Sequence, residues 1–125
     1  MKQPLYSKKL IEVFTNPKNV GKMKNPSAKG TYQSPVCGDM LTIYIKVQDN
    51  KIIDCSFETW GCMVSVGISS AVTEFAKGKS LDQAKKITKT DLEKIIGQTP
   101  PVKAHCVQMS IKALKTAIQN FKKKT

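Results

Sequence analysis

Three cysteines and one aspartate are the residues of this sequence best suited to metal chemistry. Cys37 lies two residues before Asp39, Cys62 lies near the middle of the chain, and Cys106 directly follows His105. A thiolate is both a metal ligand and a nucleophile, and a carboxylate beside thiolates adds a harder, more labile ligand. Together these residue types predict a site that binds a metal and can release it.

The spacing of these residues leaves alternatives open. The pattern C-x24-C-x43-C differs from the local C-x2-C of a zinc finger, so incidental or core cysteines remain the alternative. Asp39 could instead satisfy N–H groups in a turn. His105, the only histidine, could bind metal, relay protons or lie on the surface. Cys62 and Cys106 fall at predicted helix N-termini, where the helix dipole favours a thiolate.

The clearest element is a β-hairpin that begins shortly after Cys37. Apolar and polar residues alternate over residues 41–48 and again over 53–58. Between them, Asp49 and Asn50 have the chemistry of a tight turn. In this alternation Ile53, Cys55 and Phe57 share one strand face. Cys37 is therefore expected at the entry to a two-stranded antiparallel unit.

Helical periodicity replaces the strand pattern after Gly61. Capping boxes start helices at Ser80 and Thr90, while Gly78 and Gly97 are suited to end helices. Apolar residues at helical spacing indicate two longer helices, with the faces Val64, Ile68, Ala71, Val72 and Phe75, and Val107, Ile111, Leu114, Ile118 and Phe121.

The first third of the chain gives weaker signals. Residues 6–14 form a short amphipathic pattern, which predicts a helix. Residues 19–35 are rich in Gly, Pro, Asn, Ser and Lys, which predicts a loop with a short strand near Val20. Strands that precede a run of helices indicate an α+β fold with helices on one sheet face.

Length and composition predict one cytoplasmic domain. A chain of 125 residues suits a single unit, residues 1–125. The sequence has no apolar run long enough to span a membrane and no secretory signal at its start. In a reducing compartment, cysteines are more often ligands, nucleophiles or core residues than disulfides. Cys55, on a predicted core face, is interpreted as a small buried hydrophobe.

The net charge of +12 comes entirely from lysine, since the chain contains no arginine. A solvated basic surface of this kind suits acidic protein partners. A nucleic-acid-binding module is the competing hypothesis. It is weak here, because bidentate guanine and phosphate contacts are mainly made by arginine and no stacking motif is present.

Six short stretches, in a fixed order, give the sequence a specific resemblance. They comprise residues 16–21, 37–39, 57–62, 72–74, 77–81 and 100–106. In these stretches the chain resembles the IscU/NifU-type family of iron–sulfur cluster assembly scaffolds over nearly its full length. One departure is Met63-Val64-Ser65, where members of that family usually have Gly-Ser-Ala.

The resemblance implies a non-enzymatic scaffold built on a small, usually three-stranded antiparallel sheet packed by helices. It implies Cys37, Asp39, Cys62 and Cys106 as cluster ligands, with His105 an occasional ligand and Cys106 the sulfur acceptor. The expected cargo is a 2Fe–2S cluster, with 4Fe–4S as the alternative, and zinc can occupy the same site. A zinc-bearing sulfur acceptor that stimulates a cysteine desulfurase is the alternative function.

The resemblance also implies protein partners. A cysteine desulfurase delivers sulfur, a frataxin-like iron donor and a ferredoxin take part, and apo-proteins receive the cluster. A heat-shock chaperone pair recognises the motif Pro100, Pro101, Val102 and Lys103 in the family. Thr99 replaces the usual leucine before this motif, which leaves the chaperone as the least supported partner. A monomer and a dimer are both compatible with such a scaffold.

Overall fold

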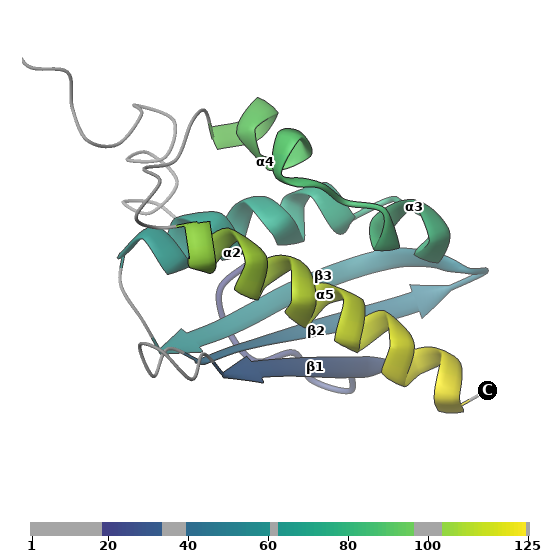
Figure 1. Cartoon of the computed structure of the whole chain (residues 1–125). Coiled ribbons are helices and arrows are strands. Elements are labelled where there is room, and N and C mark those ends of the chain that lie inside the picture. The colour runs from purple at the N-terminus through teal and green to yellow at the C-terminus, as the bar shows by residue number, and fades with distance from the viewer. Residues whose placement is uncertain (1–18, 34–39, 61–62, 97–103, 125) are drawn as a thin grey trace, which may run out of the picture.

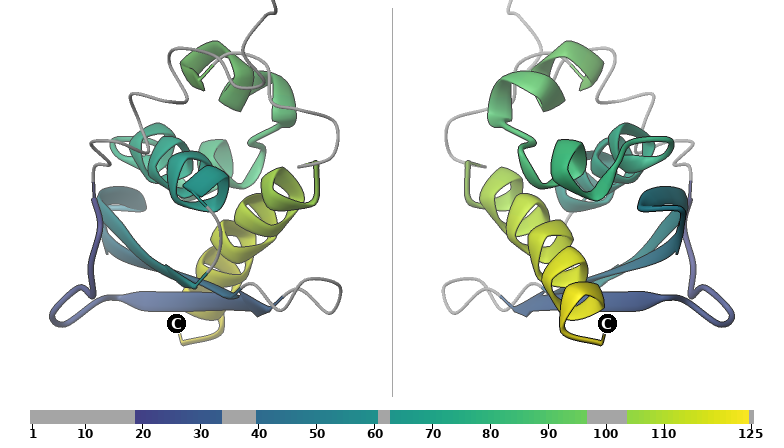
Figure 2. Two further views of the ribbon diagram at one scale, coloured as in Figure 1. Left: turned by 90° about the vertical axis from the view of Figure 1, so that its left-hand side faces the viewer. Right: turned by 90° about the vertical axis from the view of Figure 1, so that its right-hand side faces the viewer.

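The computed structural model describes residues 19–33, 40–60, 63–96 and 104–124 (Figure 1). One antiparallel sheet has the strand order β1-β2-β3, and the helices pack against one of its faces (Figure 2). This arrangement confirms the predicted α+β class. The elements are β1 (Ala28–Gln33), β2 (Met40–Gln48), β3 (Lys51–Trp60), α2 (Met63–Ala76), α3 (Leu81–Lys85), α4 (Lys89–Ile96) and α5 (Ala104–Lys124).

The predicted hairpin is confirmed as β2 and β3. Gln48 pairs with Lys51, and Asp49 and Asn50 form the two-residue connection. Both connecting residues have positive φ, 53° and 63°, which matches the turn type whose twist suits a hairpin. Asp and Asn tolerate this left-handed conformation, so local turn chemistry was sufficient to predict the connection.

The predicted core face of β3 is wrong at one position. The register shifts at a bulge, so that Lys46 pairs with Asp54 while Val47 pairs with Ile52. Ile52 is therefore fully buried, and Ile53, which was expected in the core, is 49% exposed. A bulge adds one residue to a strand and reverses the alternation beyond it.

The prediction of a loop over residues 19–35 is wrong for residues 28–33, which form strand β1, whereas residues 21–27 belong to no helix or strand. Ala28 and Gly30 are buried on the helix-covered face, and Ala28 pairs with Ile45 of β2. These small residues have low strand propensity, so packing rather than local preference determines the strand. In place of the short strand predicted near Val20, the structure has a single isolated parallel bridge between Val20 and Phe57. The predicted helix over residues 6–14 lies outside the described residues.

Helices α2 and α3 follow the sequence signals closely. Helix α2 buries Ile68, Ala71 and Val72, and Gly78 beyond its end has a φ of 82°, which favours glycine. Ser80 is the N-cap of α3, and its side chain and that of Gln83 form the expected reciprocal capping box. The chain thereby turns sharply from α2 into α3.

Helix α4 begins two residues earlier than predicted. Thr88, rather than Thr90, forms the cap: its Oγ1 accepts a hydrogen bond from the backbone N–H of Asp91 at 3.3 Å. The Thr88 backbone N–H donates in return to the Asp91 carboxylate at 3.0 Å. Both threonines precede a carboxylate at the capping spacing, which is why the sequence alone did not separate them. Gly97, the predicted end of this helix, lies outside the described residues.

We expect the variant Thr88→Ala to lose about 1 kcal/mol of unfolding free energy, because an orphan N–H of the first turn loses its acceptor. The matched variant Thr90→Ala removes the same atoms from an exposed position and should change stability by less than about 0.5 kcal/mol. Urea denaturation followed by circular dichroism measures both. A larger loss for Thr90→Ala would contradict the assigned cap.

Helix α5 crosses β1 at very close range. Its predicted face is confirmed, with Val107, Ile111, Leu114 and Ile118 buried and Phe121 half-buried. A Cβ at Gly30 would lie 2.3 Å from the Ala117 backbone nitrogen and 2.4 Å from the Ala113 carbonyl oxygen. Only glycine permits this approach, which fixes the axis of α5 over the sheet. Among the described helices, none is long and apolar enough to cross a membrane.

Candidate metal centre

One end of the sheet joins the described segments that flank the predicted ligands. Gln33, the last residue of β1, pairs with Met40, the first residue of β2. Met40 also pairs with Trp60, the last residue of β3. Helices α2 and α5 begin at this same end, on the left of Figure 1. Three strand ends and two helix N-termini are therefore gathered in one region.

The predicted ligands belong to the segments that leave this region. Cys37 and Asp39 lie between β1 and β2, and Cys62 lies between β3 and α2, all three outside the described residues. His105 and Cys106 lie in the first turn of α5. The predicted chaperone motif, residues 100–103, is also outside the described residues. The ligand set itself stays a prediction.

The described ranges contain no competing metal site. Within them, no three side chains of His, Cys, Asp or Glu converge closely enough to bind a metal ion. Cys55 is the one cysteine whose side chain is described, and its thiol is free and fully buried.

The thiol of Cys55 is unreactive at neutral pH. Burial raises its pKa to about 12, the negative charge of Asp54 adds to the rise, and Lys77 partly opposes it. The side chain lies in the core with Phe57 and Ile45. At neutral pH it is a neutral thiol, which is neither a good ligand nor a nucleophile. The prediction that Cys55 is a core residue is confirmed.

We expect Cys55 to resist alkylation by iodoacetamide at about pH 8 in the native protein and to react only after denaturation. The folded protein holds the thiol proton more tightly than the unfolded chain does. Its stabilising contribution is therefore present at neutral pH and is lost as the pH rises from about 8.5 toward 12. Mass spectrometry of peptides after timed labelling measures the reactivity. Native labelling of Cys55 at the rate of a free thiol would contradict its burial.

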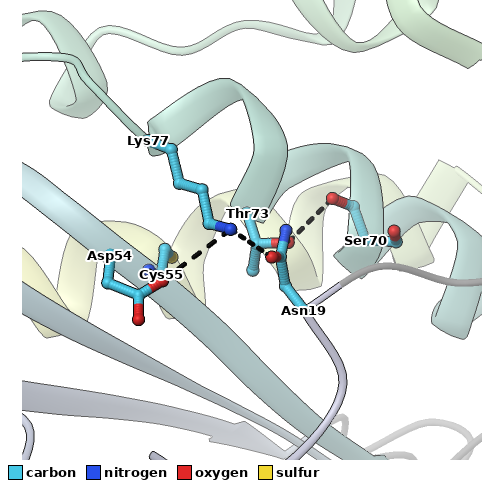
Figure 3. Close-up of polar contacts among 6 residues, drawn as sticks. All are labelled: Asn19, Asp54, Cys55, Ser70, Thr73 and Lys77. Atoms are coloured by element: carbon cyan, nitrogen blue, oxygen red, sulfur yellow. Dashed lines mark hydrogen bonds and ion pairs between the residues drawn. The ribbon is translucent and has the colours of Figure 1, made fainter.

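A polar network that the sequence did not predict ties the segment before β1 to α2 and β3 (Figure 3). The Asn19 side-chain amide donates to Thr73 Oγ1 at 3.1 Å, and Thr73 in turn donates to the Ser70 carbonyl at 2.7 Å. The Lys77 ammonium donates to the Asn19 side-chain oxygen and lies 3.7 Å from the Asp54 carboxylate. The network satisfies the buried Thr73 hydroxyl as both donor and acceptor.

A sequence signal for this network was available. Asn19, Thr73 and Lys77 belong to three of the stretches that carry the family resemblance, residues 16–21, 72–74 and 77–81. Their shared role is to hold separate elements in register, since Asn19 also pairs with β3 through its carbonyl oxygen and the Phe57 N–H. These residues connect α2, β3 and the segment before β1.

Trp60 is a second feature that the sequence analysis missed. Its side chain is 74% exposed at the end of β3, two residues before Cys62. Tryptophan is enriched among the residues that dominate protein interfaces. The only tryptophan of the chain thus borders the candidate centre.

The fold places the chain in the class of small α+β domains built on a three-stranded antiparallel sheet. Comparison with known families gives a specific match within it. The family model described as "NifU-like N terminal domain" matches residues 5–125. The chain belongs to this family.

Curated relatives cover nearly the whole chain. "Iron-sulfur cluster assembly scaffold protein IscU 1" of Archaeoglobus fulgidus is 44% identical over 120 residues, covering 96% of this chain and 78% of the relative. The IscU scaffold protein of Escherichia coli K12 is 43% identical over 123 residues, covering 95% of each chain. A Drosophila melanogaster relative, named "Iron-sulfur cluster assembly enzyme IscU", is 40% identical, covering 96% of this chain and 80% of the relative.

Solved structures share the fold at lower identity. The N-terminal part of a nitrogen-fixing NifU-like protein from Brucella abortus matches with a TM-score of 0.79 and 21% identity, covering 97% of this chain and 96% of that one. A SUF-system scaffold protein from Fervidobacterium islandicum matches with a TM-score of 0.77 and 24% identity, covering 91% and 96%. These similarities confirm the α+β fold.

Proposed function

We propose that this protein is an iron–sulfur cluster assembly scaffold. It receives sulfur from a cysteine desulfurase together with iron, builds a labile cluster on Cys37, Asp39, Cys62 and Cys106, and transfers it to apo-proteins. The observation that carries the proposal is the pairing of Met40 with both Gln33 and Trp60, which brings the flanks of two cysteine-bearing segments together. Relatives above 40% identity are named for this role.

Chain reach supports this ligand set. A fully extended chain spans at most about 3.6 Å per residue. Cys37 is three residues before Met40, so its Cα lies within about 11 Å of that residue, and Cys62 lies within about 7 Å of Trp60. Because Met40 and Trp60 are directly paired, both thiols are tethered to the same point of the sheet.

Cys106 supplies the third thiolate and the sulfur-acceptor role. It is the third residue of α5, where unpaired N–H groups and the helix dipole stabilise a thiolate. In the proposed step this thiolate attacks the terminal sulfur of the donor persulfide. The donor S–S bond breaks, a new S–S bond forms on Cys106, and the donor leaves as a thiolate. A ferredoxin supplies the two electrons that later reduce this sulfur to sulfide.

The remaining proposals follow from the same role. The scaffold has no catalytic cycle of its own, forms one domain over residues 1–125 and works in the cytoplasm, where thiol ligands stay reduced. Its cargo is a 2Fe–2S cluster before a 4Fe–4S cluster, with His105 as an additional ligand. A frataxin-like iron donor joins the desulfurase and ferredoxin as partners. The exposed Trp60 is suited to anchor one of them.

Anaerobic reconstitution with ferrous iron, cysteine and a desulfurase tests the proposal. We expect a brown protein with near-equal iron and acid-labile sulfide, and we expect serine variants of Cys37, Cys62 or Cys106 to lose most of the absorption. Cys55→Ala is the matched control and should keep the cluster, because the Cys55 thiol is buried in the core. Equal loading of all four variants would refute the ligand set.

The alternative function makes a different prediction in the same experiment. A zinc-bearing sulfur acceptor would remain colourless, retain zinc against dialysis and still increase the turnover of the desulfurase. Loss of that stimulation in Cys106→Ser, with zinc still bound, would assign sulfur acceptance to Cys106 within this alternative.

A further inference from the structure

A cavity of about 410 Å³ opens at the other end of the sheet from the candidate metal centre. Residues 19–24 form one wall, and Lys46 of β2 with residues 54–56 of β3 form the other. Lys46 and Asp54 are paired near the hairpin, whereas Met40 and Trp60 mark the opposite end of the same two strands. The cavity therefore lies toward the end of these strands opposite Met40 and Trp60.

The lining of this cavity is positively charged. Lys22, Lys24 and Lys46 are exposed lining residues, and no carboxylate of the described residues forms an ion pair with any of them. The single carboxylate of the lining, Asp54, is already engaged. It accepts a hydrogen bond from the Cys55 N–H at 2.9 Å and lies 3.7 Å from the Lys77 ammonium. The lining thus carries three lysine charges, whereas the negative charge of Asp54 is already balanced by Lys77.

At one point of the wall formed by residues 19–24, no side chain covers the backbone. Gly21, on this wall, has a φ of 122° and open space where a side chain would be. A ligand can therefore approach the backbone closely at Gly21.

We propose that this cavity binds a small polyanion that carries two or more phosphate or carboxylate groups. Lys22, Lys24 and Lys46 balance its charge. The volume lies in the range of small-molecule sites, about 300–1,000 Å³. The lining contains neither arginine nor an aromatic ring, which disfavours a nucleic-acid strand as the ligand. The bound anion joins residues 22–24 to the sheet.

This site is independent of the proposed scaffold function and is tested on the apo protein. Pyrophosphate and citrate are titrated separately into ¹⁵N-labelled protein at constant ionic strength, and amide shifts are followed. We expect saturable shifts at Gly21, Lys46 and Ser56. Response to pyrophosphate alone assigns a phosphate ligand, response to citrate alone assigns a carboxylate ligand, and response to both assigns a general polyanion site.

Matched variants separate a site from general charge attraction. Lys22→Gln/Lys46→Gln should weaken binding about tenfold, since each exposed ion pair contributes about two- to fivefold. Lys115→Gln/Lys123→Gln removes the same charge from exposed positions of α5 and should leave affinity unchanged. Equal weakening by this control pair, or no saturable shift with either anion, overturns the proposal.

Discussion

Replacing Gly30 by alanine is expected to lower the free energy of unfolding by about 3 kcal/mol or to prevent folding. The added methyl carbon would lie 2.3 Å from the backbone nitrogen of Ala117 and 2.4 Å from the carbonyl oxygen of Ala113. Backbone atoms of a helix cannot rotate away as a flexible side chain can. The only relief is for α5 to move off β1, which also strains the hydrogen bond from Asn120 to the Lys29 carbonyl.

Urea denaturation of Gly30→Ala beside Lys29→Ala measures this cost. Lys29 is the exposed neighbour on the same strand, and its truncation should change stability by less than about 0.5 kcal/mol. If the alanine variant remains as stable as the parent protein, the close approach of α5 to β1 is wrong. Because Cys106 lies two turns before Ala113 on the same helix, Gly30→Ala should also weaken binding of the proposed cluster.

The contact at Gly30 also explains what the sequence could not predict. Ala28 and Gly30 have no strand-forming character, so residues 28–33 resembled a loop until the helix that covers them was known. Helix α5 starts more than 70 residues later in the chain, and no local window contains both partners. The displaced alternation at Ile52 and Ile53 has the same origin, since a bulge depends on pairing with β2 rather than on local preference.

Features that depend on neighbouring residues were predictable. The turn at Asp49 and Asn50, the capping box at Ser80 and the buried face of α5 each follow from chemistry within a few residues. The candidate ligands were predictable only in part. Their residue types and the family resemblance pointed to them, but whether they converge depends on how the strands pair. The structure shows that pairing for the flanking residues Met40 and Trp60.

Replacing Asp39 by alanine is expected to slow cluster transfer to an apo-acceptor about tenfold, which corresponds to ~1.4 kcal/mol in the barrier. In the proposed centre Asp39 is the hard, exchangeable ligand among soft thiolates, and it opens the coordination position through which an acceptor thiol enters. With this ligand absent, three thiolates hold the cluster and the exchange step lacks its carboxylate. The bound cluster should therefore persist longer in the variant.

Transfer is measured by circular dichroism after reconstituted protein is mixed with an apo-ferredoxin without free iron. Asp82→Ala is the control, because its exposed carboxylate at the start of α3 pairs with Lys122, far from the centre. Faster release from Asp39→Ala than from the parent would disprove its role as the labile ligand. Unchanged transfer together with a loss of stability would instead assign Asp39 to a turn, as a residue that satisfies local N–H groups. The proposed function would then rest on the three cysteines alone, and the labile fourth ligand would have to come from another group, of which His105 is the nearest in sequence to a thiolate.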